Sequence, residues 1–162
     1  MIEVQNAIKT FDGNQVLKNV SAIFEAGKTN LIIGQSGSGK TVLMKSIVGI
    51  HRIDSGHILY DGRDITIMKR KQLNQLRREI GMLFQGSALF DSMTVLENVR
   101  FPLDMFSDET EDEKDRRARF CLERVELSHA VDLYPSEISG GMQKRAAIAR
   151  AIVLNPKYLF CD

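Results

Sequence analysis

The sequence predicts an α/β fold in which strands alternate with helices and a helical insert interrupts the alternation. Three observations indicate this fold. Short apolar runs end at turn signals, amphipathic periodicity appears between them, and a glycine-rich stretch joins a strand-like segment to a helix-like one. The helical insert is expected between Gly86 and Pro135.

Strands are predicted where a short apolar run ends at a turn signal. The first 24 residues alternate weakly in polarity and are expected to form two strands, paired as a hairpin or meander, that turn at Asp12-Gly13-Asn14. A turn signal at Asp61-Gly62 ends a later run. Four further strands are predicted, at Thr29–Ile33, Ile58–Tyr60, Ile80–Phe84 and Tyr158–Cys161.

Helices are predicted where apolar residues recur at intervals of three and four. Thr94 is followed three residues later by Glu97, which is the spacing of a capping box and predicts a helix start. Four further helices are predicted, over about Lys40–Gly49, Lys71–Glu79, Asp108–Leu127 and Ser139–Leu154.

The Asp108–Leu127 helix is expected to be apolar on one face and charged on the other. Two charge pairs at i,i+4 spacing are expected on its solvated face, Glu113 with Arg117 and Asp115 with Arg119. Its buried stripe is expected to consist of Ala118, Cys121, Leu122 and Val125.

Composition and charge exclude several classes of protein. The 162 residues include 22 basic and 21 acidic side chains, and 43% are apolar, which is typical of a globular domain and not of a disordered chain. A net charge of +1 gives no long-range field for gathering nucleic acid, so no nucleic-acid partner is expected. Cys121 and Cys161 follow no paired spacing and are expected to be reduced thiols of a cytosolic protein. Because no secretion signal and no run of about 20 apolar residues is present, no direct membrane insertion is expected.

The glycine-rich stretch matches the phosphate-binding pattern G-x-x-x-x-G-K-[ST], with a predicted strand before it and a predicted helix after it. Glycine lets consecutive backbone N–H groups approach phosphate oxygens, and the helix start adds a positive field. The lysine supplies a movable charge for the outer phosphates, and the threonine hydroxyl is a ligand for Mg²⁺. The predicted nucleotide-binding residues are Gly34, Gln35, Ser36, Gly37, Ser38, Gly39, Lys40, Thr41 and Val42.

This motif does not by itself distinguish a GTPase, a kinase, a motor or a transporter ATPase. The Asn-Lys dipeptide that a GTPase needs for guanine recognition is absent. A second glycine-containing element, Ile138–Arg145, places a serine and two glycines directly before a predicted helix. It is either a second phosphate-binding nest or an ordinary helix start at which Ser139 is the N-cap.

Four ordered motifs together resemble the nucleotide-binding domain of ABC transporters, and the resemblance covers the whole chain. They are the Gly34–Thr41 loop, Gln85, Ile138–Met142 and Tyr158–Asp162. The resemblance implies a P-loop NTPase (RecA-like) core with an N-terminal antiparallel β subdomain and an α-helical insert. It also implies that the chain binds ATP and Mg²⁺.

The resemblance implies a role for each site residue. Lys40 and Gln85 are expected to be catalytic, and Phe11 is expected to stack on adenine. From the residues alone, the alternatives are a core side chain for Phe11 and a solvated loop residue for Gln85. The implied Mg²⁺ ligands are Thr41, Gln85 and Asp162. The implied signature motif is Ser139, Gly140, Gly141 and Met142.

The signature departs from the family pattern in its outer residues. The family has Leu-Ser-Gly-Gly-Gln, whereas this chain has Ile138 and Met142 at the two ends. In the family, the signature contacts the γ-phosphate held by a second copy, so a head-to-tail homodimer is implied. The resemblance further implies a membrane permease partner and a cytoplasmic, peripheral location on the inner membrane. The implied division is residues 1–85 (β subdomain and Walker A part of the core), 86–138 (helical subdomain) and 139–162 (signature helix and Walker B strand).

The expected cargo rests on finer similarities. Gly81–Phe90 and the signature followed by Lys144–Ala147 are similar to Mla-type ATPases, which drive phospholipid traffic. An amino acid or another metabolite is the alternative cargo. An apolar cluster after Gln85 could receive a helix of the membrane subunit or be buried within the helical insert; its members are Leu89, Phe90, Met93, Val95 and Leu96.

The sequence stops at Asp162, before the glutamate and the histidine that the family places after Walker B. We therefore expect a C-terminally truncated domain, lacking part of the core, that binds ATP but hydrolyses it poorly or not at all. A non-catalytic nucleotide-binding fragment is one alternative. An ABC-like ATPase of DNA maintenance is another, against which the near-neutral charge argues.

Overall fold

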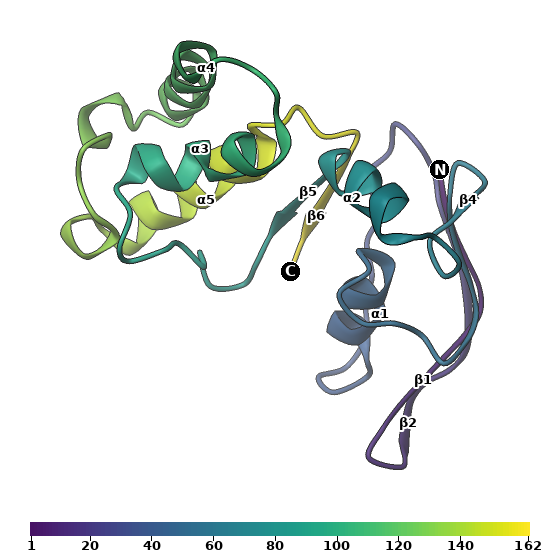
Figure 1. Ribbon diagram of the computed structural model, residues 1–162. Coiled ribbons are helices and arrows are strands. Elements are labelled where there is room, and N and C mark those ends of the chain that lie inside the picture. The colour runs from purple at the N-terminus through teal and green to yellow at the C-terminus, as the bar shows by residue number, and fades with distance from the viewer. The chain divides into compact units, whose positions relative to one another are not determined.

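The computed structural model describes all of residues 1–162, which form two compact units, Met1–Gln75 and Leu76–Asp162 (Figure 1). The three-part division expected at residues 85 and 138 stays a prediction.

The first unit is built on a four-stranded antiparallel sheet with the order β2-β1-β3-β4. The predicted hairpin is confirmed: its two-residue turn has Asp12 at φ +47° and Gly13 at φ +79°. The Asp61-Gly62 turn repeats this geometry between β3 and β4. Such left-handed turns match the twist of the strands they join. The strands are β1 (Ile2–Phe11), β2 (Asn14–Phe24), β3 (Ser55–Tyr60) and β4 (Arg63–Asp64).

The helix α1 (Lys40–Ile47) of this unit follows the glycine-rich loop as predicted. Its apolar side chains Leu43, Met44 and Ile47 are buried. The hydroxyl of Tyr60, itself fully buried in β3, donates a hydrogen bond of 2.9 Å to the carbonyl of Ile47. This bond ties the last turn of α1 to the sheet and so fixes the direction in which the helix leaves the loop.

The predicted strand at Thr29–Ile33 is wrong. The segment has no strand partner in the structure, and the side chains of Leu31 and Ile33 are each 80% exposed. An apolar run forms a strand only where a neighbouring strand satisfies its backbone groups. Its hydrophobicity alone was therefore not sufficient evidence.

The second unit combines three helices with a small parallel sheet. The strands β5 (Ile80–Leu83) and β6 (Tyr158–Cys161) pair in register from Ile80 with Tyr158 to Leu83 with Cys161, and both were predicted. The helix α2 (Arg70–Arg78) spans the boundary between the two units. The remaining elements are α3 (Val95–Phe106), α4 (Glu111–Arg124), the 3₁₀ turns η1 (Ser128–Ala130) and η2 (Pro135–Glu137), and α5 (Gly140–Ile152).

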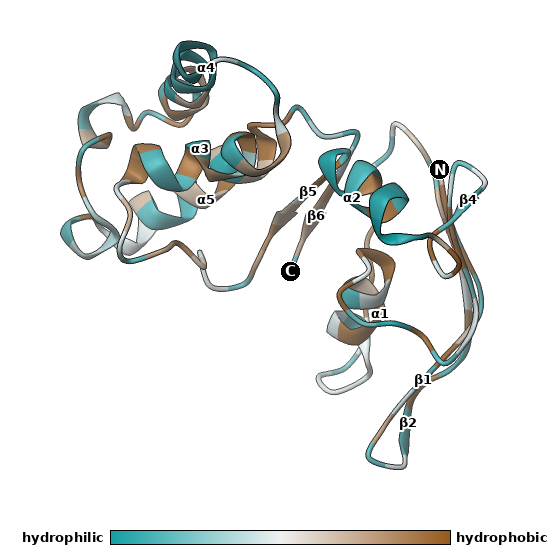
Figure 2. Cartoon of the chain, viewed as in Figure 1, coloured by the Kyte–Doolittle hydropathy of each residue, from teal (hydrophilic) through white to brown (hydrophobic).

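The core of this unit is formed by apolar side chains of α3, α4 and α5, which bear hydrophobic stripes on otherwise hydrophilic surfaces (Figure 2). The predicted stripe of α4 is confirmed at Ala118, Cys121 and Leu122, which are buried, and Val125 is partly buried against them. Small residues of α5, among them Ala146 and Ala149, complete the cluster. Small side chains at these positions let the helices pack closely.

Capping boxes begin two of these helices. Thr94 and Glu97 cap α3 as predicted, and Thr110 and Glu113 form a second box at the start of α4. The second box explains why α4 begins at Glu111 and not at Asp108.

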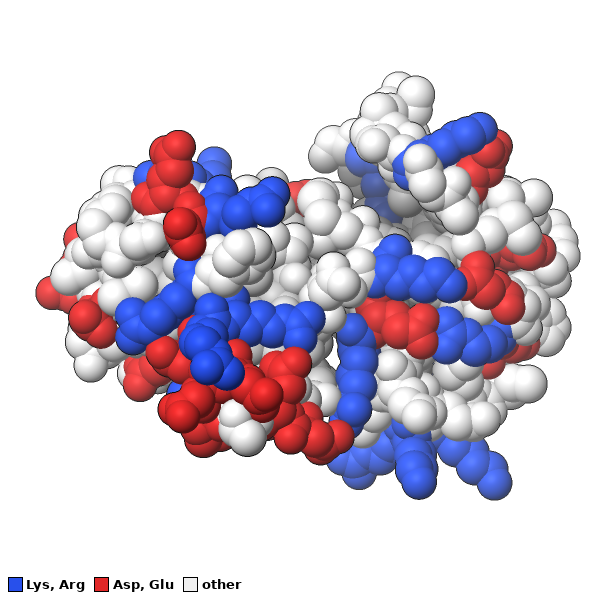
Figure 3. Space-filling model, turned by 90° about the horizontal axis from the view of Figure 1, so that it is seen from above, with Lys and Arg blue, Asp and Glu red and all other residues white.

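The second box also overturns one of the predicted charge pairs. The carboxylate of Glu113 accepts a hydrogen bond from the Thr110 backbone, and Arg117 donates to Glu109 at 2.8 Å. The predicted pair of Asp115 with Arg119 is confirmed at 2.7 Å. Charged side chains of both signs lie interspersed on the face drawn in Figure 3.

The apolar cluster expected after Gln85 is partly corrected. Val95 is fully buried, and Leu89 and Leu96 pack against the helical core, so these three belong to the interior of the unit. Phe90 is 42% exposed. Both cysteines are free thiols, Cys121 buried and Cys161 exposed. None of the helices has the length and apolar character needed to cross a membrane.

Candidate nucleotide-binding site

The glycine-rich loop of the first unit closes around the ammonium group of Lys40. The Lys40 Nζ donates to the carbonyls of Gly34 at 2.8 Å and Gln35 at 2.7 Å. The backbone N–H of Ser38 donates to the Gln35 carbonyl at 3.2 Å, which tightens the same turn. Because an ammonium has three N–H donors, one remains for a phosphate oxygen. The lysine charge is thus already positioned at the mouth of the loop.

One glycine is required by the shape of this loop. Gly39 has φ +92°, and a Cβ there would lie 3.1 Å from Val16 Cγ1 in β2. A side chain at this position would strain the backbone and push the loop away from its observed path. A Cβ on Gly34 would lie 2.8 Å from the Ser38 hydroxyl oxygen, which can rotate away.

The start of α1 completes the loop. Gly39 is the N-cap and makes no side-chain capping hydrogen bond, so the first N–H groups of α1 have no side-chain acceptor from the cap. The first intrahelical bond runs from the Leu43 N–H to the Gly39 carbonyl at 2.8 Å. Thr41 is exposed and Val42 is partly buried in this first turn. Such a helix start favours an anion.

The predicted base-stacking residue lies at the end of β1. Phe11 is 37% exposed, which excludes a core role for it. Its ring meets the edge of the His51 ring at a centroid distance of 5.3 Å, and the Lys9 ammonium lies 5.1 Å from its centroid. Lys9 is in turn paired with Asp54 at 2.8 Å. Sequence reasoning missed Lys9, His51 and Asp54, which are contributed by segments far apart in the chain.

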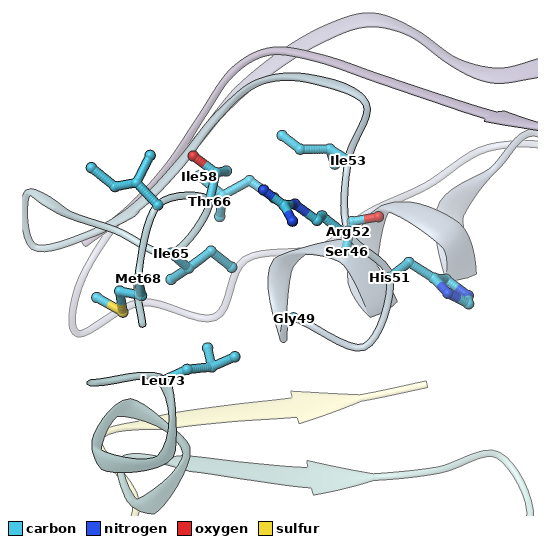
Figure 4. A pocket seen from close by; sticks show the side chains of 11 residues that line it. Ser46, Gly49, His51, Arg52, Ile53, Ile58, Ile65, Thr66, Met68 and Leu73 are labelled. Carbon is cyan, nitrogen blue, oxygen red and sulfur yellow. The ribbon is translucent and has the colours of Figure 1, made fainter. Parts of the chain in front are cut away.

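A separate hollow of about 340 Å³ lies in the same unit (Figure 4). In Figure 4 the Arg52 side chain points toward Thr66 and Ile58, whereas His51 points away from them. The other lining residues are Ser46, Gly49, Ile53, Ile65, Ile67, Met68 and Leu73. None of the residues predicted to bind nucleotide lines this hollow.

In the second unit, two predicted site residues lie at the same edge of the parallel sheet. Gln85 is exposed and comes two residues after the end of β5, and Asp162 comes directly after β6. The structure therefore brings the implied metal ligands Gln85 and Asp162 together, because β5 and β6 are parallel and paired. The carboxyl ends of parallel strands are where α/β sheets bind ligands.

The predicted signature lies at the start of α5 in the same unit. Ser139 is the N-cap, and its hydroxyl accepts a hydrogen bond of 3.3 Å from the Met142 N–H. A Cβ on Gly140 would have no atom within 4 Å, and one on Gly141 would meet only the Ser139 hydroxyl at 3.9 Å. The interior of this unit therefore does not require glycine at either position. This geometry is compatible both with Ser139 as an ordinary N-cap and with the segment as a phosphate-binding nest.

Comparison with known proteins decides the family. The sequence pattern of the ABC transporter family matches residues 17–162. The chain belongs to the ABC transporter family. It is an ATP-binding domain of this family, with the P-loop NTPase fold that the sequence predicted.

Relatives and solved structures agree with this assignment. The methionine import ATP-binding protein MetN of Clostridium acetobutylicum is 39% identical over 162 residues, which are 100% of this chain and 50% of that protein. The probable ribonucleotide transport ATP-binding protein mkl of Mycobacterium leprae is 40% identical over 161 residues, covering 99% and 46%. The chain thus spans about half the length of the curated relatives that it matches.

Among solved structures, the fold is similar to a dimeric ABC cassette. The ATP-binding cassette MJ0796, in a dimeric post-hydrolysis state bound to ADP and Pi, has a TM-score of 0.91 at 32% identity. The match covers 100% of this chain and 73% of that one. The cbiO1 protein of Clostridium perfringens, part of the cbiONQ transporter complex, has a TM-score of 0.85 at 32% identity and is covered over 64% of its length.

Proposed function

We propose that this ABC domain binds ATP with the Gly34–Val42 loop and couples the nucleotide to transport across a membrane. The observation that carries the proposal is the Lys40 ammonium, held inside the loop at the start of a helix without a side-chain cap. Loop and helix start together supply donors for the phosphates of one nucleotide. Phe11, exposed at the end of β1, supplies an aromatic face for the base.

Mg²⁺ is the proposed cofactor of the bound nucleotide. Thr41, Gln85 and Asp162 supply hydroxyl, amide and carboxylate oxygens, which are the donors that Mg²⁺ prefers. Bound there, the ion would neutralise charge on the phosphates. In this proposal Lys40 and Gln85 are catalytic, Lys40 by binding the outer phosphates and Gln85 by orienting the attacking water.

Two copies of the domain are proposed to act as a head-to-tail dimer on a membrane permease. In this dimer Ser139, Gly140, Gly141 and Met142 of one copy contact the γ-phosphate held by the other. The exposed signature glycines, with open space around them, support the proposal. The similar cassette MJ0796 was solved as a dimer, which supports the proposed dimer. The MetN relatives are named as import proteins, which supports the permease partner. A domain acting this way would be peripheral on the cytoplasmic face of the membrane.

The cargo has two proposed classes. A phospholipid is supported by the Ala88-Leu89-Phe90 segment and by Met142 in the signature. A small metabolite is supported by the named roles of the MetN and mkl relatives in methionine and ribonucleotide transport. Pull-down of the permease with the tagged domain, followed by analysis of the co-purified lipid or solute, would distinguish them.

The decisive test of the proposal is nucleotide binding by the purified chain. Titration with ATP in a calorimeter, with and without Mg²⁺, should give saturable heat that Mg²⁺ increases. Lys40→Ala should weaken that binding at unchanged helix content. Equal binding by wild type and Lys40→Ala would overturn the proposed function.

A further inference from the structure

The loop that follows Gln85 is held by a side chain of α5. Arg150 donates to two successive carbonyls of this loop, from Nη1 to Ala88 at 2.7 Å and from Nη2 to Ser87 at 2.9 Å. The guanidinium also lies 5.9 Å from the centroid of the Phe90 ring. Arg150 is partly buried, and this burial lowers the pKa of its guanidinium from the ordinary value.

The two carbonyls are presented by an unusual backbone conformation. Ala88 has φ +48°, a left-handed backbone angle that residues other than Gly, Asn and Asp rarely adopt. Such a residue persists where surrounding contacts fix it. The planar fork of Arg150 provides those contacts, because it reaches the carbonyl of Ala88 itself and that of the preceding residue.

A second contact ties the same loop to the other end of α5. The Ser87 hydroxyl donates to Gln143 Oε1 at 3.3 Å, and Gln143 in turn donates from Nε2 to the Pro135 carbonyl at 2.8 Å. Gln143 directly follows Met142 of the signature. The loop after Gln85 is therefore bound both beside the signature and near the far end of its helix.

Asn98 of α3 holds the downstream end of the loop. Its side chain is fully buried, accepts from the Phe90 N–H at 2.7 Å and donates to the Phe90 carbonyl at 3.0 Å. Between Asn98 and the signature helix, the loop has little freedom to move alone. The Phe90 amide is consequently a good reporter of whether the loop is fixed.

We propose that Arg150 is a positioning residue that holds the Gln85 loop and the signature motif as one rigid unit. Gln85 and Ser139 then move together, so the metal-side contact to the nucleotide held by the same copy and the γ-phosphate contact to the nucleotide held by the partner copy are made or broken in concert. The effect on nucleotide contacts rests on the proposed function. The rigid connection does not, because all of its residues lie in the second unit. A lysine at position 150 would keep the charge but lose the two-pronged contact.

Hydrogen exchange on the full chain without nucleotide tests the connection directly. In Arg150→Lys we expect the Phe90 amide to exchange at least tenfold faster, with amides in the first turn of α3 unchanged. Arg145→Lys is the matched control, because Arg145 lies on the same helix but donates to the Val125 carbonyl at 2.9 Å. It should leave the Phe90 amide unaffected. An unchanged Phe90 amide in Arg150→Lys, or an equal effect of both variants, would overturn the proposal.

A second measurement tests the functional consequence. Arg150→Lys should bind ATP as tightly as wild type but need about tenfold more protein to form the ATP-driven dimer, as judged by sedimentation. Arg145→Lys should match wild type in both. Absence of any ATP-driven dimer in wild type would count against the proposed function. The hydrogen-exchange result alone would then show whether Arg150 holds the loop to α5. Equal loss of ATP affinity and dimerisation in Arg150→Lys would show that the residue only stabilises the fold and would overturn its positioning role.

Discussion

The backbone N–H of Asp162 donates a hydrogen bond of 3.0 Å to the carbonyl of Leu83. This bond extends the parallel pairing of β5 and β6 beyond the last residue of β6 and sets the Asp162 backbone beside the segment that leads to Gln85. The position of the carboxylate thus depends on the strand pairing. Anything that separates the two strands would displace both implied metal ligands.

Gly81 lies within this pairing and has no room for a side chain. A Cβ there would lie 2.2 Å from the Ala151 carbonyl oxygen and 2.9 Å from Pro156 Cγ, and the carbonyl cannot rotate away. Gly81→Ala should therefore destabilise the second unit by about 3 kcal/mol or more, since overpacking against backbone is poorly relieved. Thermal unfolding followed by circular dichroism measures this. Gly86→Ala, where a Cβ would have no neighbour within 4 Å, is the control and should unfold like wild type.

Lys40→Ala should weaken ATP binding by roughly 10- to 100-fold, because a charge-assisted hydrogen bond to phosphate contributes about 1.5–3 kcal/mol. Fluorescence titration with a labelled ATP measures the affinity. Lys45→Ala, on the same helix but near its C-terminal end, should bind normally. If Lys45→Ala lost as much affinity as Lys40→Ala, a general charge effect would replace the specific contact.

Phe11→Ala should lower the affinity for ATP by about 1–3 kcal/mol, the usual contribution of base stacking. Because stacking reads the face of any base, the loss for GTP should be similar. Phe11→Tyr keeps the ring and should bind like wild type. Phe120, another exposed aromatic, lies in the second unit, so Phe120→Ala serves as the control and should leave binding intact. If Phe11→Ala bound ATP as tightly as wild type, Phe11 would not stack on the base.

Ser139 can be tested for its two roles separately. Ser139→Ala should lower stability by about 1 kcal/mol, because the N-cap bond to the Met142 N–H is lost. Ser139→Asp restores an N-cap of similar quality but places a negative charge where the γ-phosphate of the partner copy is proposed to bind. It should melt like wild type and fail to dimerise with ATP. Normal ATP-driven dimerisation of Ser139→Asp would leave Ser139 as an N-cap only.

Acid should weaken the first unit through Asp54. The hydrogen bond from Lys9, followed by the Thr10 backbone N–H, lowers the pKa of Asp54 from its ordinary value of 3.8. A carboxyl whose pKa is lower in the folded state stabilises the fold above its unfolded pKa and loses that contribution as the pH falls through the folded value. The melting temperature should therefore fall as the pH drops below about 4.

Asp54→Asn removes this titration and should flatten the acid limb of the stability curve. It should also release Lys9 from its position over the Phe11 ring. Asp91→Asn, which replaces an exposed carboxylate, is the control and should retain the wild-type acid limb. An acid limb identical in Asp54→Asn and wild type would contradict the assignment.

Local signals in the sequence were sufficient for elements whose interactions are local. The Asp12-Gly13 turn, the Thr94–Glu97 box and the glycine-rich loop each depend on residues a few positions apart, and each forms as expected. The Thr29–Ile33 segment failed because a strand also depends on a distant partner.

The contacts around the site show the same limit. Lys9 pairs with Asp54, and Arg150 with the loop at Ser87 and Ala88, across 45 to 63 positions in the chain. No periodicity in a single sequence reports such pairs. The Thr110–Glu113 box could have been found from its spacing, and it would have corrected both the start of α4 and the partner of Arg117.

The contrast between the two thiols makes this chain suitable for fluorescence labelling without mutagenesis. Burial raises the pKa of Cys121 from its ordinary value, so this thiol is inaccessible and mostly protonated at neutral pH. A maleimide dye would react at the exposed Cys161, immediately before Asp162. A change in its emission on addition of Mg²⁺ would support the proposed role of Asp162 as a metal ligand.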